Sequence, residues 1–451
     1  MSSDNIIIVP DELIQHLELL HPSDIAISLK KIRKDNREDF LLVLSKIPED
    51  ILGDVLLELP ESTRDEAYKA LSIEQLVEVI EELETDDATD VIQDIEDIDE
   101  QKAIDIMESL EEEDQHDINW LKRYEEDQAG AFMQIELFSA TLNQTVNQAI
   151  EKLKLAKASN ELENIHQLFI VDDESTLIAS ILLEDLIILD FEQTFEEILN
   201  SNNKELFKSI SVHADDDIND VVKQFEQYDL SVVAVIGYKD KLIGRITSDD
   251  ILDVVEQNAT EQMYQLAGVN DEYEQNENLI QTSTIRAKWL FLNLFTAILA
   301  SLVIGIFDET IKEFIALAIL MPIVASMGGN SGTQTLAVMV RQIALGLIDT
   351  QNSKDAIKKE IFISIFNGLL FAFLIGVIAS VWFQTYMIGI VIALAMMITL
   401  FSAGFFGAVI PLLLKKFDID PAIGSTVLLT TVTDIVGFFS FLGLAHIMLV
   451  S

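Results

Sequence analysis

The 451-residue chain contains no cysteine and only six histidines. The lack of cysteine excludes disulfide bonds, thiol nucleophiles and thiolate metal sites, so packing alone must hold the fold together. The sequence also lacks a phosphate-binding loop and a nucleophile elbow. An enzyme is therefore the least supported class of function, and we predict that the protein is not an enzyme.

Basic residues are scarce, with 29 Lys and Arg against 77 Asp and Glu and a net charge of −48. Residues 281–451 contain nine acids and nine bases, so the net charge falls entirely on the first 280 residues. This acidic part excludes nucleic acid as a partner, since phosphate binding requires a basic surface. Divalent cations are its natural partners, although solubility is a sufficient explanation for any single carboxylate.

Long runs without charge dominate the C-terminal part and predict insertion into a lipid bilayer. Ile361–Leu414 has 54 uncharged residues and must form two helices, because one span needs only about 20 residues. We expect the turn between them near Gln384, Thr385 and Tyr386. The other runs are Trp289–Phe307, Phe314–Val340 and Pro421–Ser451, the last with Asp434 as its one charge. The sequence thus predicts five transmembrane helices.

The basic residues of the connecting segments predict the orientation of these helices. The N-terminal stretch MSSDNIIIVPDE has no basic region and too short an apolar run for a signal peptide, so we expect a cytoplasmic N-terminus. The outer segments then carry Lys312 alone. The inner segments carry Arg286, Lys288, Arg341, Lys354, Lys358, Lys359, Lys415 and Lys416. Five spans place the C-terminus outside, in a multi-pass protein of the cytoplasmic (cell) membrane.

The second apolar run contains polar and helix-breaking residues at its centre, in MPIVASMGGNSGTQTLAVMVR. In hydrocarbon such residues are tolerated where protein or a water-filled cavity covers the backbone. They predict either a helix that lines an aqueous path or a tight contact between helices. The residues concerned are Pro322, Gly328, Gly329, Asn330, Gly332 and Gln334. Asn330 and Gln334 favour the path.

Asp434, in TTVTDIVGFF, lies about 13 residues into the last span, near mid-membrane depth at ~1.5 Å per residue. A carboxylate there is costly and indicates a functional site; a structural Asp bonded to Thr430 or Thr431 is the alternative. Together with Thr433, these hydroxyls offer only oxygen, which suits magnesium, calcium or sodium. Two copies of Asp434 across a dimer axis would place two carboxylates around one hydrated ion.

Residues 131–256 contain two similar units, each with a helix, a strand, a polar turn, a second strand and an acid-led helix. The strand segments are HQLFIVDDESTLIASILLEDLIIL and LSVVAVIGYKDKLIGRITSDDILDVV. This arrangement resembles a tandem pair of CBS domains, which are α/β sensing modules. We expect residues 1–130 to form an acidic, all-α superhelical domain, because their short apolar stretches have helical spacing. We expect residues 257–280 to form a connecting (plug) helix and residues 281–451 to form the five-helix transmembrane domain.

The whole chain resembles the MgtE family of magnesium channels or transporters. The motifs that carry the resemblance are PIVASMGGNSGTQ with Arg341 and ALG after it, DPA at residues 420–422, Thr433–Asp434 with Gly437, and TSDDILDVVEQNATEQ leading to LAG. The resemblance implies a homodimer with a pore made by the second and fifth spans of both chains. It matches Asp434 to the family's pore carboxylate and places Asn330 in the signature that faces it. Together with Gly329, Thr430, Thr431 and Gln334, these are the residues that we predict to line the ion pathway.

The resemblance also implies regulation, with the pore closed when cytosolic Mg²⁺ binds between the acidic soluble domains. The implied metal ligands, beside Asp434, are Asp87, Asp90, Asp229, Asp249, Asp250, Asp253, Glu256, Glu261 and Asp420. Asn258 and Gln262 replace acids usual in the family's connecting helix, which implies a weaker or missing regulatory site. Some family members bind ATP in the CBS cleft, and no residue of this sequence decides that point.

Two other functions are compatible with the same residues. Asp434 could serve a secondary transporter as a proton or sodium carrier, in which case transport would depend on pH or sodium. Alternatively, the protein could be a membrane-anchored sensor that binds divalent cations and conducts none. Uptake measurements in liposomes distinguish these hypotheses from a magnesium channel.

Overall fold

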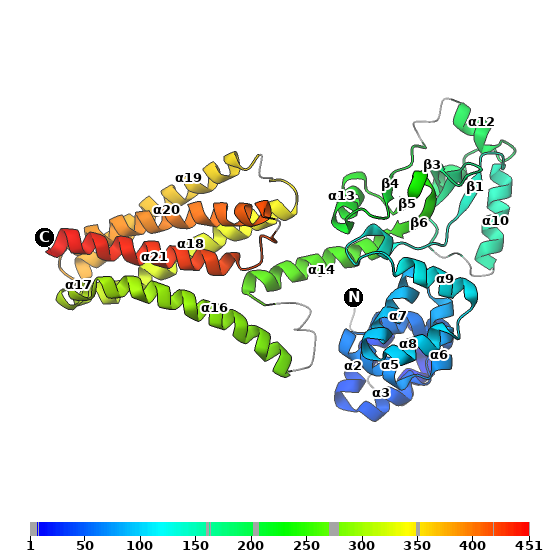
Figure 1. The fold of residues 1–451 in the computed structure, drawn as a ribbon, viewed down its shortest axis with the longest axis horizontal. Helices are drawn as coiled ribbons and strands as arrows, with labels where there is room; N and C mark the ends of the chain where they lie inside the picture. Colours follow the sequence, from blue (N-terminus) through cyan, green and yellow to red (C-terminus); the bar gives the residue numbers. More distant parts are fainter. Residues whose placement is uncertain are drawn as a thin grey trace. The chain divides into compact units, whose positions relative to one another are not determined.

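The computed structural model describes residues 7, 9–158, 162, 164–201, 207–269, 279–348, 352–417 and 419–450. The chain divides into two compact units, Met1–Gln257 and Asn258–Ser451, and each is described by itself (Figure 1). Part of the predicted connecting segment, residues 270–278, lies outside the described residues.

Short helices form the first part of unit 1, as the acid-rich turns of the sequence predict. They are α1 (Pro10–His16), η1 (Leu17–Leu19), α2 (Pro22–Asp35), α3 (Arg37–Leu44), α4 (Glu49–Leu57), α5 (Glu61–Ala70), α6 (Ile73–Glu82), α7 (Thr85–Ile98), α8 (Glu100–Met107) and α9 (Glu112–Leu121). Pro48 and Pro60 precede α4 and α5, where a proline costs no helical hydrogen bond. One apolar core runs through these helices, and it includes Leu52, Leu56 and Leu59.

Two α/β units follow, each with a three-stranded sheet. The first contains η2 (Ala129–Phe132), β1 (Ser139–Thr141), α10 (Val146–Ala158), β2 (Gln167–Val171), β3 (Leu177–Leu182), α11 (Leu183–Leu186) and α12 (Phe195–Asn200). The second contains β4 (Ser211–His213), α13 (Ile218–Tyr228), β5 (Val232–Ile236), η3 (Tyr238–Asp240), β6 (Leu242–Thr247) and α14 (Ser248–Ala267). In each sheet the first strand runs parallel to the central strand and the third runs antiparallel to it.

The repeated topology confirms the predicted strand–turn–strand units. Both central strands, β2 and β5, are buried along their whole length, which explains their unbroken apolar sequences. Phe169 and Val171 of the first sheet pack with Val232, Ala234 and Leu242 of the second, so the two sheets share a core. Strands β1 and β4, of three residues each, were not predicted from the sequence.

Helix α14 begins in the second α/β unit and continues without a break to Ala267. Gly268, the next residue, has φ +73°, a left-handed conformation that glycine adopts without strain and that commonly ends helices. Helix α14 therefore ends within residues 257–280, the predicted connecting segment. One helix thus contains both the acidic residues that follow β6 and the stretch that precedes the membrane part.

Five helices of the described chain are long and apolar enough to cross a membrane, as predicted. They belong to α16 (Leu279–Ile306), α18 (Ile315–Ala344), α19 (Lys354–Trp382), α20 (Tyr386–Lys416) and α21 (Ser425–Ala445), which η4 (His446–Val450) extends. The short α17 (Asp308–Glu313) joins the first two. Gln384, with φ +52°, lies in the turn between α19 and α20, where the sequence predicts it.

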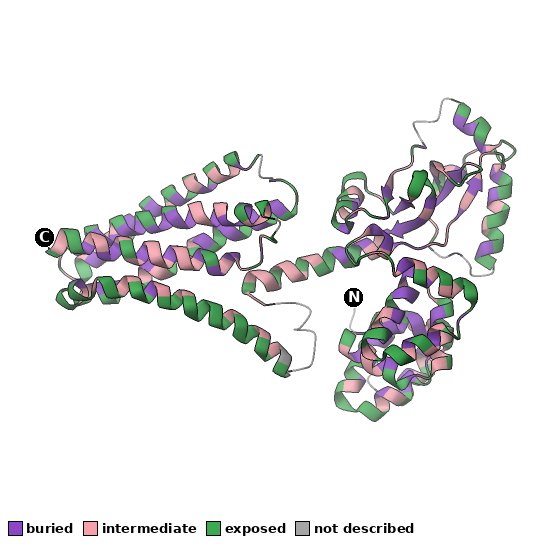
Figure 2. Ribbon diagram, viewed as in Figure 1, coloured by how far each residue is buried: buried purple, intermediate pink, exposed green. Residues whose placement is uncertain are grey.

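Within this bundle α20 is the most enclosed helix and packs on α18, α19 and α21 (Figure 2). Helix α16 packs on α21 and is exposed along nearly all of its apolar surface. A surface of this kind needs lipid or protein around it. The mostly helical fold with an N-terminal helical part, two α/β units and five candidate spans agrees with the predicted fold class.

Candidate functional site

Helices α18 and α21 cross at their glycines. A Cβ built on Gly437 of α21 would meet Val324 of α18 at 3.3 Å, and one on Gly332 of α18 would meet Leu429 at 3.0 Å. Between these contacts, a Cβ on Gly328 would lie 3.5 Å from Thr433. From one contact to the next, the residue number rises by four on α18 and falls by four on α21, so the two helices are antiparallel. Asn330 and Asp434 therefore lie at about the same level of the bundle.

The apolar run with polar residues at its centre forms one continuous helix, since α18 passes through Pro322 and the glycines without interruption. Its glycines lie on two different sides of the helix. Gly328 and Gly332 are buried against α20 and α21, which is the tight helix contact that the sequence offered as one of two interpretations. In contrast, a Cβ added to Gly329 would have no neighbour within 4 Å.

The other side of α18 is polar and open within one chain. Ser326, Asn330, Thr333 and Gln334 are exposed, and Asn330 Nδ2 lies 3.4 Å from Ser326 Oγ. Amide and hydroxyl groups at this depth require water or protein partners, because hydrocarbon offers none. This side of the helix is what the water-path interpretation requires.

Asp434 is half-buried, and no described residue donates a hydrogen bond to its carboxylate or forms an ion pair with it. The nearby hydroxyls bond to their own helix instead. Thr430 Oγ1 donates to the Thr426 carbonyl at 2.9 Å, and Thr431 Oγ1 donates to the Val427 carbonyl at 2.6 Å. A structural Asp held by Thr430 or Thr431, the alternative considered from the sequence, is therefore not the arrangement found.

The end of α14 contacts the C-terminal part of α18 and the N-terminal part of α21. Thr426 Oγ1, at the start of α21, donates to the Leu266 carbonyl at 2.9 Å. The Leu266 side chain packs on a cluster that contains Leu336 of α18 and Leu429 of α21. Asp420 lies just before α21, is exposed, and accepts a hydrogen bond from the Ala422 backbone N–H at 2.7 Å.

Unit 1 contains a second concentration of carboxylates, where the first turn of α7 meets the first turn of α14. We call it the acidic cluster; it consists of Glu84, Asp86, Asp87, Asp90, Glu136 and Asp250. Burial and then the neighbouring Asp250 raise the pKa of Asp87 to about 8. Burial likewise raises the pKa of Asp250 to about 6, although two hydrogen bonds from Thr247 oppose the shift. Ionising these groups together is thus unfavourable without a cation.

Two buried carboxylate oxygens of the acidic cluster have no hydrogen-bond partner among the described residues. They are Oδ1 of Asp86, whose side chain belongs to a residue only 5% exposed, and Oε2 of Glu136. The other Glu136 oxygen accepts a bond from Thr85. Oxygen donors of this kind fit a hard divalent cation such as Mg²⁺. Glu84, Asp86 and Glu136 were not predicted as ligands from the sequence, where the run TDDATD around Asp87 was the available signal.

Arg245 is the counter-charge of the acidic cluster. It is 2% exposed, and its Nη2 donates to Glu84 Oε1 at 3.2 Å while Nη1 donates to the Asn164 carbonyl at 3.2 Å. Burial nevertheless raises the pKa of Glu84 to about 7 against the effect of this arginine. One arginine thus leaves the cluster with a large excess of acids.

The structure brings only some of the predicted metal ligands together. Asp87, Asp90 and Asp250 belong to the acidic cluster, with Asp249 as its exposed neighbour. Asp253 and Glu256 are exposed further along α14, near Glu58. Asp229 is exposed at the end of α13, and Glu261 accepts a bond from Gln265. In the described part of the chain, no three His, Cys, Asp or Glu side chains already stand as a metal-binding group.

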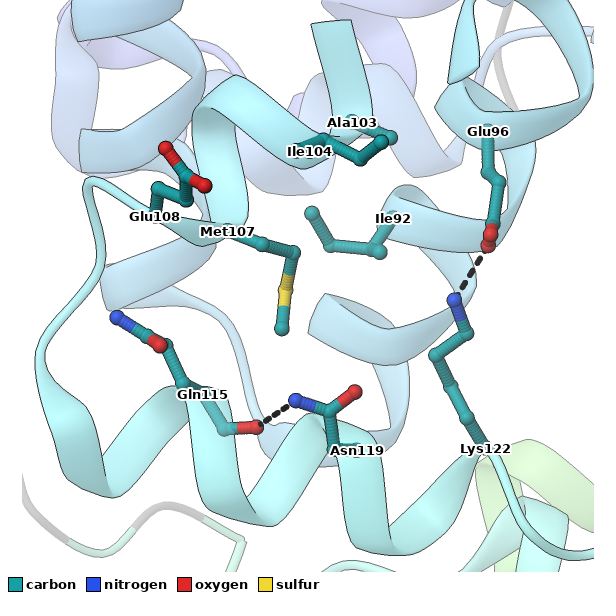
Figure 3. Close-up of a pocket in the computed structure, with 9 residues that line it drawn as sticks. All are labelled: Ile92, Glu96, Ala103, Ile104, Met107, Glu108, Gln115, Asn119 and Lys122. Atoms are coloured by element: carbon teal, nitrogen blue, oxygen red, sulfur yellow. Dashed lines mark hydrogen bonds and ion pairs between the residues drawn. The ribbon is translucent and has the colours of Figure 1, made fainter. Parts of the chain in front are cut away.

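A separate hollow of about 240 Å³ lies between α7, α8 and α9 (Figure 3). Ile92, Ile104 and Met107 form its apolar part, and the ion pair of Glu96 with Lys122 lies at one side. Asn119 Nδ2 is already bonded to the Gln115 carbonyl at 2.6 Å. The amide of Asn119 and the Glu96–Lys122 pair are therefore already engaged, and none of the predicted site residues lines the hollow.

Known proteins resemble the chain in each of these parts. Residues 321–444 match the MgtE divalent cation transporter profile, residues 20–127 match the MgtE intracellular N domain, and residues 204–257 match the CBS domain. The magnesium transporter MgtE of Enterococcus faecalis is 33% identical over 329 residues, which are 73% of this chain and 71% of the relative. The chain belongs to the MgtE family.

A second MgtE magnesium transporter, from Thermus thermophilus, is 28% identical over 96% of this chain and 94% of its own length. Among solved structures, the cytosolic domain of the Mg²⁺ channel MgtE in complex with ATP is 29% identical, covers 55% of this chain and 95% of that chain, and has a TM-score of 0.49. Membership of the MgtE family confirms the resemblance drawn from the motifs. It supports magnesium transport by a multi-pass membrane protein as the function.

Proposed function

We propose that the protein is a homodimeric magnesium channel of the cytoplasmic membrane, closed by cytosolic Mg²⁺. The observation that carries the proposal is the open polar side of α18, with Asn330 at the level of the unpartnered carboxylate of Asp434. Gly329, Gln334, Thr430 and Thr431 complete the proposed path. Their oxygen atoms suit a cation that keeps most of its water.

A dimer follows from the ligand count and from the uncovered surfaces. One Asp434 per chain is a small ligand set for a divalent ion, whereas two copies across a two-fold axis supply two carboxylates. The polar side of α18 also needs a cover that one chain does not supply among its described residues. A second copy that places the same helix opposite would enclose a shared aqueous path.

Orientation in the membrane is proposed from the basic residues. Eight of the nine Lys and Arg after residue 280 lie on one side if the five helices alternate in direction. That side is the cytoplasmic one by the positive-inside rule, which places the N-terminus inside and the C-terminus outside. We also retain the proposed division into residues 1–130, 131–256, 257–280 and 281–451.

Gating is proposed to arise at the acidic cluster. When its acids are ionised they repel across the contact between α7 and α14, and the contact loosens. Asp86, Asp87, Asp90, Asp250 and Glu136 would hold Mg²⁺, which removes this repulsion and tightens the contact. The more exposed Asp249, Asp253, Glu256 and Asp229, with Glu261 and Asp420 nearer the membrane part, are proposed as ligands of further regulatory ions.

Helix α14 provides the connection from the acidic cluster to the path. Asp250 lies in its first turn, and Leu266 in its last turn contacts Thr426 of α21 and the cluster that contains Leu336 of α18. A change in the position of α14 therefore acts directly on both helices of the proposed path. This is a rigid-element coupling, in which a small shift at one end displaces the other.

ATP is proposed as a ligand of the α/β pair. A hollow of about 280 Å³ lies between residues of the two units, which include Lys208, Ser209, Ser211 and Asp240. A lysine and two hydroxyls can contact phosphates, and an aspartate can accept bonds from a ribose. Nucleotide binding there would act on the same pair of units that carries α14.

The experiment that tests the proposal is Mg²⁺ uptake into liposomes that contain the wild-type protein or Asp434→Asn, with internal Mg²⁺ varied. We expect wild-type uptake that falls as internal Mg²⁺ rises, no uptake with the variant, and matching unfolding temperatures. Uptake that depends on sodium or pH would support a secondary transporter. Absence of uptake with the folded wild-type protein would support the non-conducting sensor.

A further inference from the structure

A buried glutamate lies inside the membrane bundle, away from the proposed path. Glu360 of α19 is 7% exposed, although it stands only six residues, about 9 Å, from the start of a span. Its Oε2 accepts a hydrogen bond from Thr335 Oγ1 of α18 at 3.2 Å, and Thr335 is itself 5% exposed. The nearby acid–base pair of α19 joins Lys358 to Asp355, and no ion pair of Glu360 exists among the described residues.

Three helices meet closely around this hydrogen bond. A Cβ on Gly407 of α20 would lie 2.8 Å from the Gly332 carbonyl oxygen and 3.0 Å from Thr335 Cβ. A Cβ on Gly404 of α20 would collide with Ser364, one turn after Glu360 on α19. Helix α20 thus packs closely on both α18 and α19 beside this bond, and the bond itself joins α18 directly to α19.

Thr335 lies close to the polar residues of α18 that line the proposed path. It directly follows Gln334, which lies on the open polar side, and it is about 7.5 Å along the helix from Asn330. Consecutive residues differ by about 100° around a helix, so a bond that holds Thr335 against α19 also fixes the direction of Asn330 and Gln334. Rotation of α18 by a fraction of a turn would remove both amides from the path.

We propose that Glu360 is a positioning residue for ion passage, which acts through its hydrogen bond with Thr335 to hold the rotation of α18. The inference rests on the proposed path, in which Asn330 and Gln334 of α18 face Asp434. Glu360 itself does not touch the transported ion. Its charge is not required for this role, because only an acceptor oxygen opposite the Thr335 hydroxyl is used.

The test uses the full chain in liposomes and compares Glu360→Ala, Glu360→Gln, Thr335→Val and the double variant Glu360→Ala/Thr335→Val. We expect Glu360→Ala and Thr335→Val each to lower the maximal rate of Mg²⁺ uptake about fivefold to tenfold, since each removes one buried bond. The double variant should be no slower than either single variant. Glu360→Gln should restore uptake, because its amide oxygen also accepts a hydrogen bond.

Ser364→Ala is the matched control, since Ser364 is buried on the same helix one turn away and we expect wild-type uptake from it. Unfolding temperatures separate loss of the fold from loss of position, and Thr335→Val keeps side-chain shape if Glu360→Ala fails to fold. Additive losses, or a Glu360→Gln variant as slow as Glu360→Ala, would overturn the positioning role. Absence of wild-type uptake would instead overturn the proposed function.

Discussion

Arg245 Nη2 and Glu84 Oε1 lie 3.2 Å apart, and this ion pair joins the helical N-terminal part to the second α/β unit. The arginine is fixed from a third side by the Asn164 carbonyl. It therefore places a permanent positive charge inside the acidic cluster. The repulsion among the other acids acts on a contact that is already joined at one point, so loss of cations is expected to loosen the contact without separating the parts completely.

We predict that Arg245→Gln weakens this contact strongly. Breaking a buried pair costs about 3–5 kcal/mol, and we expect the lower end because the Glu84 side chain is 22% exposed. The measurement is hydrogen exchange of the first turn of α7 in the full-length protein. Arg37→Gln is the control, since the Arg37 side chain of the pair with Glu66 is 73% exposed and its loss should change exchange little.

The acidic cluster also predicts a pH dependence. Burial raises the pKa of Asp87 to about 8 and that of Asp250 to about 6, above the ordinary value of 3.8, so the folded state binds more protons than the unfolded state over this pH range. Stability without divalent cations should therefore fall as the pH rises from about 4 to about 8. Protection of α7 amides at pH 5 and pH 8 in the presence of a chelator measures this.

Added Mg²⁺ should restore protection of α7 more at pH 8 than at pH 5, because metal ligands must be deprotonated. Sodium chloride at equal ionic strength is the control for general screening, which acts on exposed charges and reaches buried ones less. Equal restoration by both salts would show that the cluster is screened and not bound by Mg²⁺.

If the proposed channel is closed by Mg²⁺ at the acidic cluster, neutralising the cluster should uncouple uptake from internal Mg²⁺. We predict that Asp87→Asn/Asp250→Asn continues to take up Mg²⁺ at internal concentrations that close the wild-type channel, since the amides neither repel nor bind Mg²⁺ strongly. The control is Glu226→Gln, an exposed acid on α13 outside the cluster. Closure of the double variant at the wild-type concentration would place the regulatory ions elsewhere.

Much of the membrane part could be predicted, because long runs of uncharged residues can be recognised directly in a sequence. The run Ile361–Leu414 divides at Gln384, as its length demands. Glu360, which directly precedes that run, was not singled out from the sequence, yet it is buried and bonded to Thr335 of another helix. Only the hydrogen bond to Thr335, formed where α18 and α19 both pack on α20, reveals its place.

The acidic cluster shows the same limit. Asp87 and Asp250 were predicted from family motifs, whereas Asp86, one residue away, carries the buried oxygen without a partner. Which of two adjacent carboxylates points inward depends on the contact between α7 and α14, and helical periodicity within α7 alone does not specify it. The strands β1 and β4 were missed because three residues are too few to establish an alternating pattern.

The two adjacent glycines of α18 give a paired test of its two sides. We predict that Gly328→Ala destabilises the protein by about 1–3 kcal/mol, because its Cβ would lie 2.7 Å from Thr399 Cγ2, and Thr399 is fully buried and β-branched. Gly329→Ala should leave the stability unchanged or slightly raised, since nothing lies within 4 Å of its Cβ and alanine favours a helix.

Mg²⁺ uptake tests the open side of α18 separately from stability, because the stable variant Gly329→Ala is the one expected to affect the proposed path. Gly329→Ala narrows the open polar side beside Asn330, so we expect slower Mg²⁺ uptake from a protein that unfolds at the wild-type temperature or above it. The measurements are thermal unfolding in detergent and uptake in liposomes for both variants. If Gly329→Ala were as destabilising as Gly328→Ala, Gly329 would be packed against protein. This side of α18 would then form a helix contact and would not line a water-filled path.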